Sequence, residues 1–339
     1  MLHTLGLTRR KNSSEGVGTL ILHIGGGKTG SSFLQSKLAQ NSELLKHHGV
    51  LYKSGPELNR ALSGQVTSGN GAWLSDYLCH DEKSRESSKA LDLLLDQASK
   101  PFEDVVLSSE KLQHFSPNRM FALHDKLKKE GRKLHVVYFT RSVAGRAYSA
   151  YRQRVKRHLE KREFSTWLKR YKHNCIAITE KLESSLPKES FSIRNYDYHR
   201  TSMFGFFCSE FLRIDQVTKD QGTEEQLVNR SLNHAETEIM RTLNGYVRDE
   251  KVATTLGHAL IASESIGGEP SIQMKDVKYL ESQFSEKIAI VNRYLPDEEK
   301  ASVVGPNDLV SEDKVGSSLT EIDIHQLRLI AAIANYRVS

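Results

Sequence analysis

A glycine-rich loop near the start of the chain limits its fold more than any other segment. Residues 17–24 (Val-Gly-Thr-Leu-Ile-Leu-His-Ile) are mostly apolar and run into the three glycines at 25–27. Apolar side chains then recur with helical spacing at Phe33, Leu34 and Leu38. A short apolar run of this kind is typical of a buried strand. The pattern therefore predicts a strand, a tight glycine turn and a helix, which together are the opening unit of an α/β fold.

The next segments continue the alternation of strands and helices. We predict further strands at 104–109, 134–140 and 190–194, with helices at 117–130, from Ala144 onward and at 163–185. Strands that alternate with helices form crossover units, so we expect a mainly parallel central sheet flanked by helices. Residues 56–80 are rich in glycine, serine and asparagine and predict an irregular surface loop.

The patterning changes along the chain and suggests three parts. Residues 1–16 carry no periodic pattern and are expected to form a flexible tail. The alternating core is predicted at 17–215. Beyond Ile214 the strand signal fades and helical periodicity dominates, at about 224–247 and 276–295. The part at 216–339 is therefore predicted to be mostly helical.

Composition and charge exclude several classes of protein. The formal net charge of +6 suits an anionic ligand but is too small to indicate nucleic acid. No apolar run approaches the roughly 18 residues of a membrane helix, and no apolar segment follows the basic residues at 9–11 as in a secretory signal. The three cysteines are scattered and suggest neither disulfides nor a metal site. We therefore expect a cytoplasmic protein without a transmembrane segment.

The chemistry of the glycine loop points to a bound phosphate. Residues 25–32 nearly match the Walker A motif, but Ser31 stands where the lysine belongs and Lys28 lies inside the loop. Backbone N–H groups at the start of the helix and the helix dipole favour an anion there. A kinase or ATPase would also need a magnesium site, normally with an aspartate at the end of a neighbouring strand. The strand at 104–109 is followed instead by Glu110 and Lys111.

Two motifs resemble the signatures of sulfotransferases that use 3′-phosphoadenosine 5′-phosphosulfate (PAPS). Residues 27–32 (Gly-Lys-Thr-Gly-Ser-Ser) resemble the 5′-phosphosulfate loop P-K-[ST]-G-[ST]-[ST], with glycine at the proline position. Arg141, which ends the strand at 134–140, and Ser149, eight residues later, resemble the pair that holds the 3′-phosphate. The usual Arg-Asp-Pro is replaced by Arg-Ser-Val, so the chain is closer to bacterial and carbohydrate-type members than to the cytosolic small-phenol branch.

The resemblance covers about 17–215 and implies a P-loop-like three-layer fold that needs no metal. It implies that PAPS is the donor and that the acceptor is a hydroxyl or amine, expected on a saccharide or glycolipid, anionic ones included. Glu110 would be the general base, with His114 as the alternative, and Lys28 would stabilise the leaving phosphate. Tyr196 resembles the tyrosine that meets the adenine ring. The cofactor-binding residues implied are Gly27, Lys28, Thr29, Gly30, Ser31, Ser32, Arg141, Ser149 and Tyr196.

Two other functions remain open at this stage. The first is an ATP-dependent P-loop kinase, which the position of the lysine disfavours. The second is a non-catalytic module that keeps the fold and binds an anion, which the presence of both Lys28 and Glu110 disfavours. The acceptor pocket is expected in variable loops and in the C-terminal part, so the sequence does not identify the acceptor.

Overall fold

The computed structural model of the chain describes residues 18–53, 67–79, 84–97, 104–215, 231–262, 271–306, 308–311, 326 and 330. The chain divides into two compact units. The first comprises Met1–Thr140, Asn174–Val228 and Ile290–Ala301, and the second comprises Arg141–His173, Asn229–Ala289 and Ser302–Ser339. The tail predicted at 1–16 lies outside the described residues. The predicted division into a core at 17–215 and a part at 216–339 stays a prediction.

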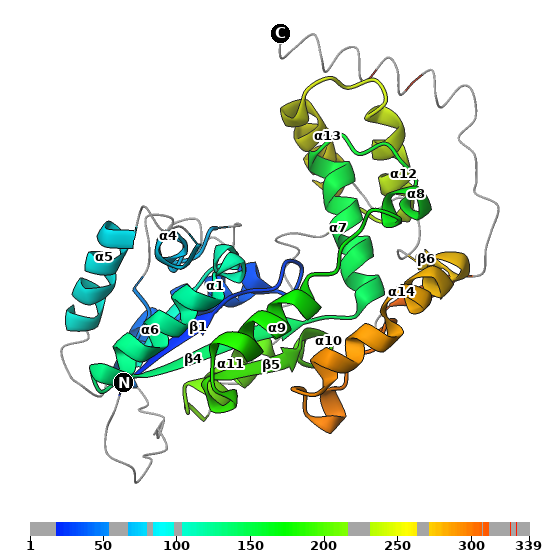
Figure 1. Cartoon of the computed structure of the whole chain (residues 1–339). Coiled ribbons are helices and arrows are strands. Elements are labelled where there is room, and N and C mark those ends of the chain that lie inside the picture. The colour runs from blue at the N-terminus through cyan, green and yellow to red at the C-terminus, as the bar shows by residue number, and fades with distance from the viewer. Residues whose placement is uncertain are drawn as a thin grey trace, which may run out of the picture. The chain divides into compact units, whose positions relative to one another are not determined.

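The first unit contains a five-stranded sheet in which every pair of neighbouring strands is parallel (Figure 1). The strand order is β2-β3-β1-β4-β5, which confirms the predicted α/β class. The strand before the glycine loop, β1, lies at the centre, where Leu22 pairs with Leu107 on one side and Val136 on the other. The strands are β1 (Thr19–His23), β2 (Val50–Leu51), β3 (Asp104–Ser108), β4 (Lys133–Thr140) and β5 (Phe191–Asn195).

Both faces of the sheet are buried, which explains the unbroken apolar runs of the sequence. Side chains alternate between the two faces of a strand, so Leu20 and Leu22 point to one face and Ile21 to the other. All three are almost completely buried. A parallel sheet covered on both faces has no solvent-facing row in its central strands.

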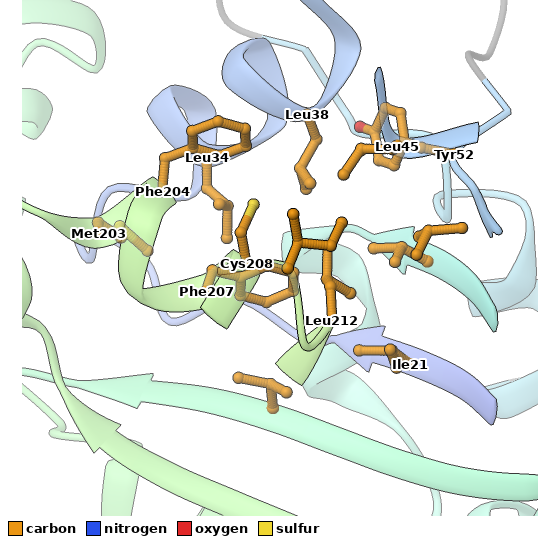
Figure 2. Close-up of a cluster of buried hydrophobic side chains, with 14 of the residues drawn as sticks. Ile21, Leu34, Leu38, Leu45, Tyr52, Met203, Phe204, Phe207, Cys208 and Leu212 are labelled. Carbon is orange, nitrogen blue, oxygen red and sulfur yellow. The ribbon is translucent and has the colours of Figure 1, made fainter. Parts of the chain in front are cut away.

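A cluster of buried side chains anchors the helix that follows the glycine loop (Figure 2). Leu34 and Leu38 project from α1 (Ser31–Gln40) toward Ile21 of β1, and Phe204 and Phe207 reach the same cluster from α11 (Met203–Phe211). Each large apolar side chain buried in this way contributes roughly 1.5–3 kcal/mol. The loop between β1 and α1 is therefore held at both ends by the core.

The remaining helices of the first unit connect these strands. Pro117 stands in the first turn of α6, as predicted, where its missing N–H costs nothing. The elements are α2 (Ser42–His47), α4 (Leu74–Cys79), α5 (Ser84–Gln97), η1 (Glu110–His114), α6 (Pro117–Lys129), α9 (Cys175–Ser185), η2 (Lys188–Ser190), α10 (Tyr196–His199) and η3 (Asp297–Glu299).

Two local predictions are wrong. The segment predicted as an irregular loop at 56–80 contains the helix α4, whose apolar side chains Leu74, Tyr77 and Leu78 are buried. The single helix predicted at 163–185 is two helices, α8 (Phe164–Leu168) and α9. The largely polar run at 169–174 offers no apolar face with which to continue the first helix, so the chain leaves the helical path there.

The second unit is mostly helical, and the described residues of the predicted helical part at 216–339 are mostly helical too. Its longest helix in the first half of the chain, α7 (Val143–Arg157), packs against α8, α12 (His234–Leu243) and α13 (Glu250–Ala262). A capping box between Asn233 and Glu236 starts α12. No sequence pattern predicts the short parallel pair β6 (Ser271–Gln273) and β7 (Leu309–Ser311). The long helix α14 (Met274–Asn292) follows β6 directly.

Candidate functional site

The glycine loop follows the carboxyl end of the central strand β1, at the edge of the sheet where open α/β folds bind ligands. Three of its residues have positive φ angles: Gly25 at 50°, Lys28 at 69° and Gly30 at 72°. Glycine adopts this conformation freely, but for lysine it costs of order 1–3 kcal/mol. The fold therefore holds Lys28 in a conformation that its own backbone preference opposes.

The carbonyl oxygen of Gly26 organises the loop from within. It accepts hydrogen bonds from the backbone N–H of Thr29 at 3.2 Å, from Thr29 Oγ1 at 2.6 Å and from Ser31 Oγ at 3.5 Å. The helix α1 then starts after Gly30, which stands at its N-cap and provides no side-chain cap, and its first turn contains no acidic residue. The positive end of the helix dipole at Ser31 and Ser32 is thus left for an external anion.

The side chain of Glu110 lies against this loop. A Cβ atom added to Gly25 would lie 3.0 Å from Glu110 Cγ and 2.9 Å from Ser31 Oγ, and one added to Gly26 would lie 2.6 Å from the Phe139 carbonyl oxygen. These two glycines therefore permit a close approach that no other residue type allows. The structure therefore places Glu110, the base that the resemblance implies, beside the loop that contains Lys28.

A segment that the sequence analysis overlooked fixes the end of β3 and with it Glu110. Asn70 donates through Nδ2 to the Val106 carbonyl at 2.9 Å and accepts from the Ser108 N–H at 2.8 Å. Ser109 Oγ donates to the Ser68 carbonyl at 2.6 Å and accepts from the N–H of Lys111 at 3.2 Å, which caps η1 at its start. The Ser-Gly-Asn-Gly run at 68–71 was the available signal, because this composition is typical of tight turns.

Tyr196 lies on the other side of the loop, against Gly30. A Cβ atom added to Gly30 would lie 2.7 Å from Tyr196 Cε2 and 2.9 Å from Met203 Sδ. Tyr196 opens α10, and Asn195 Oδ1 caps this turn by accepting from the N–H of Asp197 at 3.0 Å. The ring that the resemblance assigns to the adenine is therefore in contact with the loop.

Glu299 anchors the turn that carries Tyr196, although nothing in the sequence singled it out. Its carboxylate accepts from the Asn195 N–H at 2.9 Å and lies 2.8 Å from His199 Nε2. Burial alone would raise the pKa of Glu299, but the hydrogen bonds from His199 and Asn195 and the charge of Arg194 hold it below its ordinary value. The late segment at 297–299 thus supports a residue of the candidate site.

The two histidines near the loop differ in their surroundings. His114, the alternative base, is exposed at the end of η1, whereas Glu110 is half-buried at its start. His23 is fully buried inside β1, with its Nδ1 atom 2.8 Å from Ser108 Oγ. Burial lowers the pKa of His23 to about 4, so this side chain is neutral at physiological pH.

Arg141 and Ser149 belong to the second unit, whereas the loop, Glu110 and Tyr196 belong to the first. Arg141 follows the last residue of β4 directly, and Ser149 lies buried in the second turn of α7. The start of α7 is capped within its own unit: Gly145 donates its N–H to Asp308 Oδ2 at 3.2 Å, and Ala144 donates its N–H to the Val303 carbonyl at 2.9 Å.

The described part of the chain contains no group of three or more histidine, cysteine, aspartate or glutamate side chains able to hold a metal ion. Among the helices in that same part, none is both long enough and apolar enough to cross a membrane. The three cysteines are free.

Comparisons with known proteins do not assign the chain to a family. No family model matches the chain, and no curated protein and no solved structure matches it either.

Proposed function

We propose that the chain is a PAPS-dependent sulfotransferase. The observation that carries the proposal is the contact between Glu110 and Gly25, because it sets a carboxylate beside the loop that bears Lys28. A cation and a base at one phosphate-binding loop are the two groups that sulfuryl transfer to a hydroxyl requires of a protein. The crowding around Gly25, Gly26 and Gly30 fits a loop whose backbone approaches a phosphate closely.

Each residue of the candidate site would have its own role in sulfuryl transfer. PAPS, when bound, supplies an activated sulfuryl group and a 5′-phosphate that gains negative charge as the group departs. Lys28 and the first N–H groups of α1 would neutralise that charge. Glu110 would take the proton from the acceptor as it attacks, with His114 as the alternative base. Ser32 would add a hydroxyl donor, and Tyr196 would stack on the adenine. The hydroxyls of Thr29 and Ser31 already donate to the Gly26 carbonyl and would hold the loop in shape.

Arg141 and Ser149 would hold the 3′-phosphate. Arginine binds a phosphate through two parallel hydrogen bonds, and a hydroxyl adds a third donor. Removal of the guanidinium in Arg141→Ala is expected to weaken binding of adenosine 3′,5′-bisphosphate (PAP) by roughly 2–4 kcal/mol. Ser149→Ala is expected to cost about 1 kcal/mol. Adenosine 5′-phosphosulfate lacks the 3′-phosphate, so its binding should change little in either variant.

The acceptor is proposed to be a hydroxyl or amine of a saccharide or glycolipid. The net charge of +6 favours an acceptor that is itself anionic. We place the reaction in the cytoplasm, in line with three cysteines that are free.

Calorimetric titration with PAP and with Mg·ATP tests the proposal. PAP should bind with micromolar affinity or better in the presence of EDTA, because Lys28, Arg141 and the loop N–H groups supply the compensating charge. Tighter binding of Mg·ATP, or loss of PAP binding in EDTA, would favour the kinase. A screen of saccharide and glycolipid acceptors with labelled PAPS, read by mass spectrometry, then tests turnover. Binding of PAP without turnover on any acceptor would favour the non-catalytic module.

A further inference from the structure

Arg152 of α7 forms no ion pair with a carboxylate in the part of the chain that the structure describes. Its guanidinium lies over the ring of Tyr148, 4.9 Å from the centroid, and its Nη1 donates to the Leu232 carbonyl at 2.9 Å. Its Nε is shielded from solvent and has no hydrogen-bond partner in the part of the chain that the structure describes. Buried donors of this kind are rarely left unpaired in native proteins.

Two other arginines of the same unit each have a carboxylate partner. Arg162 pairs with Glu160 at 2.5 Å, and Arg241 pairs with Glu238 at 2.6 Å. Arg152 pairs with no described carboxylate, and the positive charge it meets is that of Arg141. Burial lowers the pKa of Arg152, Tyr148 raises it, and the repulsion from Arg141 lowers it further. A partly desolvated guanidinium without a counter-ion, as at Arg152, is costly unless a ligand supplies the negative charge.

The geometry of α7 places Arg152 beside the residue expected to bind phosphate. Ser149 and Arg152 are three positions apart, so they share one face of the helix, and Ser149 is buried there. Asp308 lies at the start of that helix, where its carboxylate accepts from the N–H groups of Gly145 and Gly305 at 3.2 and 2.8 Å. Because Asp308 and Val303 already cap the first turn, a ligand on this face would have to be held by side chains.

We propose that Arg152 binds a phosphomonoester together with Arg141 and Ser149. Two guanidinium groups and a hydroxyl match the charge and the acceptor atoms of a phosphate dianion. The stacking on Tyr148 holds the guanidinium in place before the ligand arrives, which reduces the entropy lost on binding. The identity of the phosphomonoester as the 3′-phosphate of PAPS rests on the proposed function, but the anion site itself does not.

The test compares Arg152→Gln with Arg154→Gln, a matched change at an exposed arginine on the same helix. PAP and adenosine 5′-monophosphate are titrated calorimetrically into both variants and the wild type. We expect Arg152→Gln to weaken PAP binding by about 10- to 100-fold, the range for a lost hydrogen bond to a charged group, and to leave the 5′-monophosphate nearly unchanged. Arg154→Gln should leave both unchanged. Arg152→Lys keeps the charge but not the planar guanidinium, so its PAP affinity should lie between those of Arg152→Gln and the wild type.

Thermal unfolding without ligand separates a ligand-binding role from a structural one. Because Arg152 is half-buried and pairs with no carboxylate among the described residues, Arg152→Gln should have a Tm equal to or above that of the wild type. PAP binding equal to that of the wild type would overturn the proposal. So would a lower Tm combined with equal losses for both nucleotides, since that is the result expected of a structural arginine.

The anion site can be judged even if the proposed function fails. Suppose that the wild type binds neither nucleotide. Inorganic phosphate should then raise the Tm of the wild type and of Arg154→Gln, but not that of Arg152→Gln. An equal rise in all three proteins, or none in any of them, would refute the role of Arg152 and leave no phosphate site on α7.

Discussion

Protonation of His23 should make the first unit sensitive to acid. The imidazole is fully buried in β1, with Ser108 Oγ beside Nδ1 and the rings of Phe139 and Phe207 in edge contact. Its Nε2 has no hydrogen-bond partner among the described residues. A charged imidazole could not be solvated there, and burial lowers the pKa of His23 from 6.5 to about 4.

The two pKa values of His23 set the size and the direction of the effect. At about 1.4 kcal/mol per pH unit, the difference between the unfolded and folded values corresponds to roughly 3 kcal/mol at most. Between pH 6.5 and about 4 the unfolded chain binds the proton more readily than the folded chain. The contribution of neutral His23 to the unfolding free energy is therefore complete above pH 6.5. It is lost as the pH falls toward 4 and changes no further at lower pH.

Urea unfolding at several pH values measures how the unfolding free energy changes with pH. The chain has two tryptophans, and Trp73 belongs to the first unit whereas Trp167 belongs to the second. In a Trp167→Phe background, fluorescence reports the first unit alone. His23→Gln should flatten the fall in unfolding free energy between pH 6.5 and 4 by up to roughly 3 kcal/mol. His47→Gln, at an exposed position in α2, is the control.

Other acidic groups also titrate in this range, but they add the same slope to every variant, so the difference between variants isolates the histidine. A slope for His23→Gln that matches both the wild type and the control would refute the reasoning. It would mean that water or a local rearrangement reaches the buried imidazole.

Three further predictions concern the candidate site. Glu110→Gln should reduce turnover by about 10²–10⁴-fold with PAP affinity unchanged, whereas Lys28→Ala should reduce both, as measured by steady-state kinetics and calorimetry; a silent Glu110→Gln would transfer the role of base to His114. Gly30→Ala, at a φ of 72°, should destabilise the protein by about 1–3 kcal/mol in urea unfolding, while Gly205→Ala, where the new Cβ meets nothing within 4 Å, should not. Glu299→Gln should lower the unfolding free energy by roughly 1–3 kcal/mol at pH 7, and the gap to the wild type should close as the pH falls through the depressed pKa of Glu299; an equal gap at every pH would show that the charge of the carboxylate is not what matters.

The parts of the fold that the sequence predicts well are those in which burial dictates the pattern. The strands β1, β3 and β4 are covered on both faces, so each appears as a largely apolar run that is hard to mistake, whereas β5, at the edge of the sheet, alternates apolar and polar residues. The helix α4 was missed because its six residues are too few to show a helical period. The strands β6 and β7 have three residues each, and Leu309 and Val310 are exposed, so neither burial nor alternation marks them.

The residues of the candidate site also differ in how well the sequence predicts them. The glycines can be predicted because the backbone geometry of a tight turn demands them, and Lys28 can be predicted because a cation in such a loop suits an anionic ligand. The residues that support the site from a distance in sequence have no such mark. Asn70 bonds to β3 across 36 and 38 positions, and Glu299 reaches Asn195 across 104. A lone asparagine or glutamate predicts no partner, and only the folded chain shows which one it meets.

The interleaving of the two units has a consequence for synthesis of the chain on the ribosome. Asn195 ends β5, but Glu299, which accepts its N–H, is added 104 residues later. At about 5–20 residues per second, the end of β5 waits roughly 5–20 s for its partner. The second unit is started at 141–173, before this interval, and is resumed at 229–289 within it. Neither unit can therefore mature as an independent nascent domain, and a chain released near position 215 would carry all five strands of the sheet without the segment that closes it.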